Sequence, residues 1–232
     1  MKPGDKFSAG AMTVKILILD WDGTMFDSMA AKELAFAKTI GNFAGRPAQS
    51  SGRDIAAMYR KHSGHPRTVV IDRVCKDLGL APSENQVAEI ANNLGSAMSE
   101  LTGECPLFPD TSQLIGALRH LPLKLYISSS VPEPELRYMV SRKLNASDLE
   151  RFSGIFGTTA DSAKGEGHVR RILSGGAQPE RDQILAVGDD EADVELHLQA
   201  GVRCLLVDRE RRDSRTDGVL HSLDELVNYL YE

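Results

Sequence analysis

The chain has 232 residues, of which 41% are hydrophobic and 26% are charged, as in a globular protein with a substantial core. Its net charge of −6 argues against a nucleic-acid binder, and no apolar run approaches the roughly 20 residues of a membrane span. The three cysteines are far apart and odd in number, which disfavours disulfides and a zinc site and indicates a reducing cytoplasm.

Residues 1–12 are small and polar, so we expect a flexible N-terminal tail. The first predicted element is a buried strand from Val14 to Leu19, which leads directly into Asp20, Asp22 and Gly23. Two carboxylates this close repel one another unless a cation lies between them or one of them holds a proton. The end of this strand is therefore a candidate metal site, and the glycine allows a tight turn over it.

Residues 28–105 carry no strand pattern and predict an inserted helical domain. Ser83 is an expected N-cap for the last helix of this segment. The predicted helices are Ala30–Ile40, Arg53–His62, Thr68–Leu78 and Ser83 to about Leu101, with a loop over Gly41–Gly52.

After Pro106 the sequence alternates between predicted strands and helices. Such alternation is typical of an α/β fold, here a Rossmann-like parallel sheet with helices on both faces. We expect residues 13–27 and 106–232 to form this core. Its strands are Leu123–Ile127, Gly154–Phe156, Ile184–Val187 and Arg203–Val207; its helices are Asp110 (as cap) to His120, Pro132–Leu144, Gly165–Leu173, Glu191–Ala200 and Ser222–Tyr231.

Reactive polar residues follow the predicted strands. Because ligands of an open parallel sheet bind beyond the carboxyl ends of its strands, we expect these side chains to meet. Lys164 is predicted in the first turn of a helix capped by Asp161 or Ser162, where it opposes the helix dipole at a cost of about 0.3–1 kcal/mol, which suggests a functional role. The strand ends supply Asp20, Asp22, Ser128, Ser129, Ser130, Asp189, Asp190 and Asp193.

These groups suit phosphoryl transfer. Asp20 would attack phosphorus and form an aspartyl-phosphate, while Asp22 would protonate the leaving oxygen and later take a proton from water. A hydroxyl at the second strand end and Lys164 would hold the phosphoryl oxygens. Mg²⁺ held by Asp20 and Asp189 would offset the repulsion between phosphate and the acids.

The chain resembles the haloacid dehalogenase-like (HAD) superfamily. The segments DWDGT, ISSS, Lys164 and GDDEAD match its four motifs in order. The resemblance implies that Asp20 is the nucleophile and that Asp22 is the acid/base, with its carbonyl as a metal ligand. It also implies phosphate contacts from Gly23, Ser129, Ser130 and Lys164, and metal contacts from Asp20, Asp22, Asp189 and Asp193.

Some assignments stay open. Pro132 favours Ser129 over Ser128 as the phosphate ligand by family analogy, and Asp190 is either a second metal ligand or a solvated acid. Helical insertions at this place in the family close over the site as a cap and select the substrate. In the insertion, Lys32 would face the leaving group. The candidates for lining a pocket for an anionic substrate are Arg53, Arg60, His62, His65 and Arg67, although such residues are more often a solvated face.

The predicted activity is that of a magnesium-dependent phosphatase acting on a small phosphate ester, such as a sugar phosphate or a phosphoglycolate-like acid. Three alternatives are a phosphomutase, a dehalogenase and a catalytically idle binding protein. Asp22 disfavours the dehalogenase, because halide loss needs no acid. We expect no nucleic-acid or membrane partner, and a monomer or a homodimer.

Overall fold

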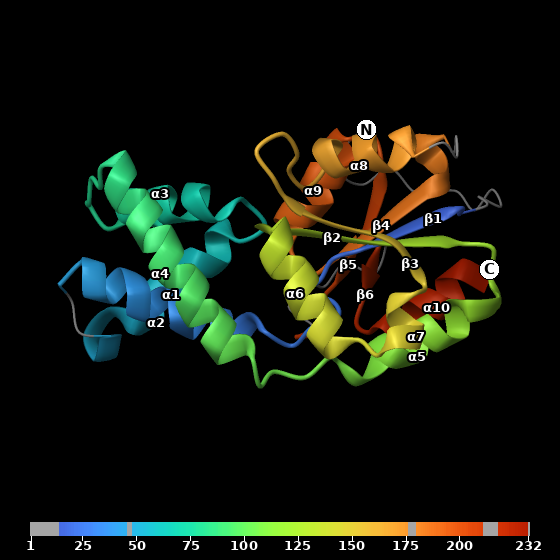
Figure 1. Ribbon diagram of the computed structural model, residues 1–232, viewed down its shortest axis with the longest axis horizontal. Coiled ribbons are helices and arrows are strands. Elements are labelled where there is room, and N and C mark those ends of the chain that lie inside the picture. Colours follow the sequence, from blue (N-terminus) through green and yellow to red (C-terminus); the bar gives the residue numbers. More distant parts are fainter. Residues whose placement is uncertain (1–13, 46–47, 176–179, 211–217, 232) are drawn as a thin grey trace.

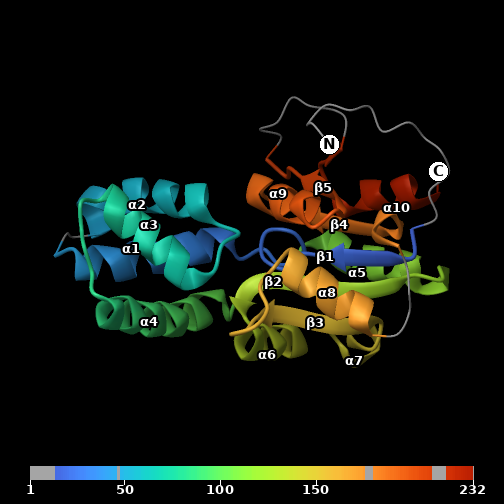
Figure 2. The same cartoon turned by 90° about the horizontal axis from the view of Figure 1, so that it is seen from above.

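The computed structural model describes residues 14–45, 48–175, 180–210 and 218–231, so the expected tail at residues 1–12 lies outside the described residues. Two bodies are visible side by side, one built on a sheet and one made only of helices (Figures 1 and 2). The chain passes from the first to the second near residue 28 and returns near residue 105. No helix in the described ranges has both the length and the apolar character needed to cross a membrane.

The sheet has strand order β3-β2-β1-β4-β5-β6 over the described residues, and all of its pairings are parallel. β1 lies in the middle, paired through Ile18 with Tyr126 on one side and with Ala186 on the other. This confirms the predicted α/β class with a Rossmann-like parallel sheet. The strands are β1 (Ile16–Leu19), β2 (Lys124–Pro132), β3 (Phe152–Thr158), β4 (Ile184–Gly188), β5 (Arg203–Val207) and β6 (Val219–Leu220).

Helices cover both faces of the sheet. Leu17, Leu19 and their neighbours on one face pack against α5 (Pro109–Ala117), α6 (Glu133–Lys143) and α10 (Leu223–Tyr231). The opposite face, with Ile16 and Ile18, packs against α8 (Glu166–Ser174) and the end of α9 (Glu191–Gln199). Successive strand residues point to opposite faces, so a strand buried on both sides is apolar throughout, as the ILIL of β1 is.

The helical body has a hydrophobic cluster of its own. Phe36, Ile71 and Leu94 are fully buried there, between helices that are far apart in sequence. Its helices are α1 (Met29–Phe43), α2 (Ala48–His62), α3 (Arg67–Asp77) and α4 (Glu84–Thr102). Ser83 caps α4 in a capping box with Gln86, as its position before a helical pattern predicts.

Several predicted boundaries are wrong, and packing explains the main ones. α1 continues past Gly41 because Ile40 and Gly41 are buried, and α2 begins at Ala48, inside the predicted loop. Asp110 does not cap its helix; it lies in the first turn after Pro109, where its carboxylate pairs with Arg209 and accepts a hydrogen bond from the Leu223 amide. No element was predicted at β6, α7 (Ala146–Leu149) or the 3-10 turn η2 (Arg181–Gln183), and the helix predicted to run to His120 ends in the 3-10 turn η1 (Leu118–His120).

Candidate active site

Three acidic side chains meet where β1 and β4 end. Asp20 follows β1, Asp189 follows β4, and Asp193 lies in the first turn of α9. Carboxylate oxygens of the three all lie within 4.8 Å of one another. Because β1 and β4 are adjacent parallel strands, their carboxyl ends reach the same edge of the sheet and bring together residues about 170 positions apart.

The turn after β1 needs a glycine. Gly23 has φ 80°, in the left-handed region, and a Cβ there would lie 1.9 Å from Oδ2 of Asp189. The turn therefore lets backbone approach the acidic cluster closely. Arg209 stabilises this turn: it donates hydrogen bonds to the carbonyls of Gly23 and Thr24 and forms an ion pair with Asp110.

Asp22 faces the helical body. Its Oδ1 accepts a 2.6 Å hydrogen bond from the Ser28 hydroxyl, and Lys32 of α1 forms an ion pair with Oδ2 at 2.8 Å. Burial works against the charged form of Lys32, but the carboxylate of Asp22 outweighs it and raises the pKa of Lys32. Lys32 is thus a cation that the helical body supplies to this carboxylate.

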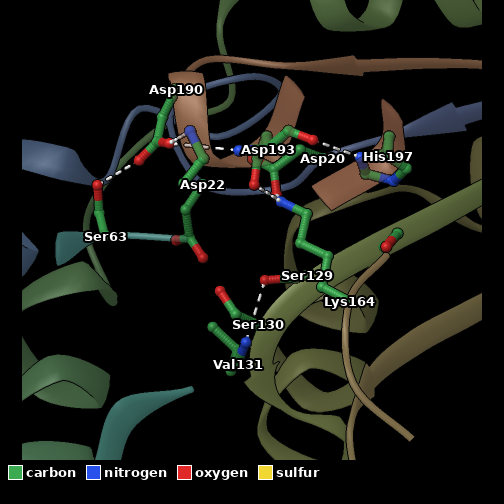
Figure 3. Close-up of polar contacts among 12 residues, drawn as sticks. Asp20, Asp22, Ser63, Ser129, Ser130, Val131, Lys164, Asp190, Asp193 and His197 are labelled. Carbon is green, nitrogen blue, oxygen red and sulfur yellow. Dashed lines mark hydrogen bonds and ion pairs between the residues drawn. The ribbon is translucent and has the colours of Figure 1, made fainter. Parts of the chain in front are cut away.

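Lys164 lies between two of the acids. Its Nζ is 2.5 Å from Oδ1 of Asp20 and 2.5 Å from Oδ1 of Asp193 (Figure 3). The placement of Lys164 inside a helix was wrong, because α8 begins at Glu166 and Gly165 before it has φ 86°. The expected side-chain cap from Asp161 or Ser162 is also absent from this described helix. The lysine sits on the loop between β3 and α8, so it does not oppose the helix dipole, and the ion pairs alone argue for its role.

The cluster carries more negative charge than Lys164 can balance. Burial, followed by the neighbouring carboxylates, raises the pKa of Asp189 well above its usual value. Burial also raises the pKa of Asp20, and it raises that of Asp193 to about 7 although the ammonium of Lys164 opposes this. A divalent cation fits such a set, since three carboxylates, two buried and one half-buried, and one ammonium leave an excess of negative charge on hard oxygen ligands.

The serines of β2 have separate environments. Ser128 is fully buried and its Oγ lies 2.8 Å from Nδ1 of His168. Ser129 and Ser130 line the cavity together with Asp20 and Lys164, and the Ser129 oxygen accepts a hydrogen bond from the Val131 amide (Figure 3). Ser129 thus faces the acids, whereas Ser128 faces away from them.

Asp190 is a helix cap. Its carboxylate accepts hydrogen bonds from the amides of Ala192 and Asp193 at the start of α9, and it also accepts one from the Ser63 hydroxyl in the helical body. These contacts occupy the side chain and turn it toward the loop between α2 and α3 (Figure 3). Asp190 was expected to be either a second metal ligand or a solvated acid. Its contacts make it instead the cap of α9 and a hydrogen-bond acceptor from the helical body.

Residues of the helical body close the cavity over the acids. Lys32, Arg67 and Ser63 line it, but Arg53 and Arg60 lie elsewhere, in a surface hollow where Arg60 pairs with Glu33. Arg67 and His65 were among the basic residues expected to line such a pocket, and both line this cavity. Ser63 was not predicted, because a polar residue near a helix end carries no sign of what it faces.

The sequence matches no protein-family model and no curated protein. Its fold, however, is shared by many solved structures. A HAD-like hydrolase from Streptococcus pneumoniae is 21% identical with a TM-score of 0.72, and the match covers 94% of this chain and 98% of that one. CbbY from Rhodobacter sphaeroides, solved with phosphate, is 18% identical with a TM-score of 0.70, covering 92% and 96%.

A third similar structure, YfnB from Bacillus subtilis, was solved with magnesium; it is 16% identical, with a TM-score of 0.64 and coverage of 94% and 99%. Identities this low speak for architecture alone. The strand order, the acids at the strand ends and these likenesses lead to one statement: the chain has the fold of the HAD-like hydrolases.

Proposed function

We propose that this protein is a magnesium-dependent phosphatase that hydrolyses a small phosphate monoester through an aspartyl-phosphate. The observation that carries the proposal is the convergence of Asp20, Asp189 and Asp193, two of them paired with the Lys164 ammonium, beside Asp22 and Ser129. A nucleophile, an acid, a hydroxyl and a cation then surround one small space. CbbY with phosphate and YfnB with magnesium, which share the fold, support the same reading.

In the first half-reaction, an Asp20 carboxylate oxygen bonds to phosphorus and the bond from phosphorus to the leaving oxygen breaks. Asp22 gives its proton to that oxygen, and the alcohol departs. In the second half-reaction, Asp22 takes a proton from water, whose oxygen bonds to phosphorus while the Asp20 ester bond breaks. The products are an alcohol and inorganic phosphate.

Transition-state charge spreads over the phosphoryl oxygens, so fixed donors supply much of the catalysis. Lys164 and the hydroxyls of Ser129 and Ser130 are donors that line the cavity with Asp20. The ligands of Mg²⁺ would be Asp20, Asp189 and Asp193, with the Asp22 carbonyl. When bound, the ion supplies charge neutralisation and Lewis acidity toward a phosphoryl oxygen.

The helical body, residues 28–105, acts as the cap in this proposal. It holds Lys32 against Asp22 and covers the acids with the loop around Ser63. A closed cap excludes bulk water during the first half-reaction, and its opening admits the hydrolytic water and releases the alcohol.

The variant Asp20→Asn tests the proposal most directly. We expect phosphate release from 4-nitrophenyl phosphate in Mg²⁺ to fall by roughly 10³-fold or more, because an amide oxygen is a poor nucleophile. Asp27→Asn is the matched control, since Asp27 is an exposed acid of the same loop. Equal turnover by Asp20→Asn and wild type, or no metal dependence in wild type, would contradict the proposed mechanism.

A further inference from the structure

Beside the acids lies a second, larger cavity, which the proposed mechanism does not use. It is a cleft of about 650 Å³ between α4 of the helical body and α6 of the α/β body, whereas the chamber over the acids measures about 60 Å³. Small-molecule sites typically hold about 300–1,000 Å³. The chamber is thus too small for a whole organic ester, and the cleft is of the right size.

The two cavities meet at the proposed acid. Asp22 and Lys32 line both of them, as do Arg67, Met98 and Val131. Asp22 must touch the leaving oxygen to protonate it. The bond that breaks would therefore lie at this junction, with the phosphoryl group in the chamber and the alcohol in the cleft.

The chemistry of the cleft walls points to a neutral, hydroxyl-bearing group. α4 contributes the amide of Asn92 and the hydroxyls of Ser96 and Ser99, while Tyr138 and Met139 of α6 add a phenol and an apolar surface. Amide and hydroxyl groups both donate and accept hydrogen bonds, as the hydroxyls of a polyol do.

The charges in the cleft disfavour a second anion. Lys32 is paired with Asp22, and Arg67 makes a two-pronged ion pair with Glu135, through Nη1 at 3.0 Å and Nη2 at 2.5 Å. Glu100 adds a further carboxylate to the wall. An anionic leaving group would have to displace one of these pairs and approach Glu100.

We propose that the cleft between α4 and α6 binds the alcohol part of the substrate, and that this part is an uncharged polyhydroxylated group of sugar size. This inference rests on the proposed phosphatase function and deepens it. Between the two substrate classes that the sequence leaves open, it selects the sugar-phosphate type over the phosphoglycolate type.

The test fills the cleft with Ser96→Trp, and separately with Ser99→Trp, and compares both with Asn93→Trp. Ser96, Ser99 and Asn93 are exposed on α4, but Asn93 does not line the cleft, so all three variants should fold. The probes are glucose 6-phosphate, phosphoglycolate and 4-nitrophenyl phosphate, with inorganic phosphate as a competitive inhibitor.

We expect wild type to prefer glucose 6-phosphate to phosphoglycolate, and the two serine variants to lose about tenfold or more in kcat/KM for glucose 6-phosphate, mainly through KM. Inhibition by inorganic phosphate should not change, because phosphate occupies only the chamber. The inference is overturned if Asn93→Trp and the serine variants behave alike, or if wild type prefers phosphoglycolate. Failure of the underlying function looks different, since wild type would then release no phosphate from any of the three esters.

Discussion

The two bodies of this protein handle charge in opposite ways. In the α/β body, Asp20, Asp189 and Asp193 lie close together and one ammonium, that of Lys164, pairs with two of them, so negative charge is in excess. At the border with the helical body, cations and acids are matched one to one, as in Lys32 with Asp22 and Arg67 with Glu135. The first arrangement suits a resident cation, and the second suits contacts that open and close.

The largest expected effect comes from Lys164, the cation of the acidic cluster. Lys164→Met should lower kcat by roughly 10³-fold, because it removes a donor to the phosphoryl oxygens and leaves the carboxylates unbalanced. Loss of one partner from a buried ion pair also costs about 3–5 kcal/mol of unfolding free energy. Steady-state kinetics and thermal unfolding with and without Mg²⁺ measure both effects.

The excess negative charge of the cluster predicts a second effect of Lys164→Met, on its stabilisation by Mg²⁺. If a cation resides in the cluster, Mg²⁺ should recover more thermal stability in Lys164→Met than in wild type, since the ion replaces the missing positive charge. Lys124→Met, at the exposed start of β2, is the control. If Mg²⁺ stabilises Lys164→Met and wild type equally, the lysine and the metal do not balance the same negative charge.

A smaller effect is expected at the border. Lys32→Met should lower kcat by about 10-fold to 100-fold, because Asp22 loses the ion pair that orients it beside the leaving oxygen. Lys38→Met, on the exposed side of the same helix, controls for changes to α1 itself. Kinetics in which the Lys32 variant matches the Lys38 variant would mean that the helical body gives Asp22 no help.

The contact between Arg67 and Glu135 should matter least for turnover. The Glu135 side chain is 43% exposed, so solvent screens the pair, and a double-mutant cycle of Arg67→Gln with Glu135→Gln should give a coupling of about 0.5–1 kcal/mol in kcat/KM. The direction of the change in KM and in the rate of alcohol release is more informative than its size. If this pair holds the bodies closed, each single variant should raise the KM and the rate of alcohol release, and the double variant should add little.

The same contrast between the bodies explains what the sequence could predict. β1 and β4 are apolar runs that stop at acids, so the parallel sheet and the meeting of Asp20 with Asp189 follow from local pattern and strand register. The contact of Lys164 with Asp20 spans 144 residues. The helix-dipole argument that singled out Lys164 was wrong, because the lysine lies before α8, so only the family resemblance supported the right place for it.

Other features depend on tertiary contacts that no local pattern encodes. The role of Arg209 is one, because it joins the turn after β1 to Asp110 across nearly the whole chain. The helical body is another: whether a basic side chain on a helix faces solvent, as Arg53 does, or faces the acids, as Lys32 does, depends on how four helices pack. The incorrect helix placement of Lys164 has a backbone cause, the positive φ of Gly165.

The last prediction concerns the folding stability of the α/β body, not turnover at neutral pH, and depends on His168. Burial, with help from the cations of Lys164 and Arg171, lowers the pKa of His168 to about 4. Its ring is neutral, and since the Gly157 carbonyl can only accept, Nε2 donates to it and Nδ1 accepts from the Ser128 hydroxyl. The neutral ring thus ties β2 to β3.

Protonation of His168 favours the unfolded chain, where an ordinary histidine has a pKa near 6.5. Between about pH 6.5 and pH 4, the unfolded chain binds a proton at His168 that the folded protein does not bind. Stability therefore falls as the pH falls through this range. The loss from this one group amounts to about 3 kcal/mol, since each pKa unit is worth about 1.4 kcal/mol.

Urea unfolding of wild type and His168→Gln at several pH values from 7.5 to 4.5 isolates this loss, because other titrating groups, His197 and the acids among them, contribute to both proteins. The glutamine variant should be less stable at pH 7.5, since its amide replaces a fitted ring, yet it should lose less stability on acidification. The difference between the two proteins would then shrink as the pH falls. A difference that stays constant would show that His168 binds its proton as readily in the folded protein as in the unfolded chain. The lowered pKa of His168, and the neutral ring assigned between β2 and β3 below about pH 6.5, would then be wrong.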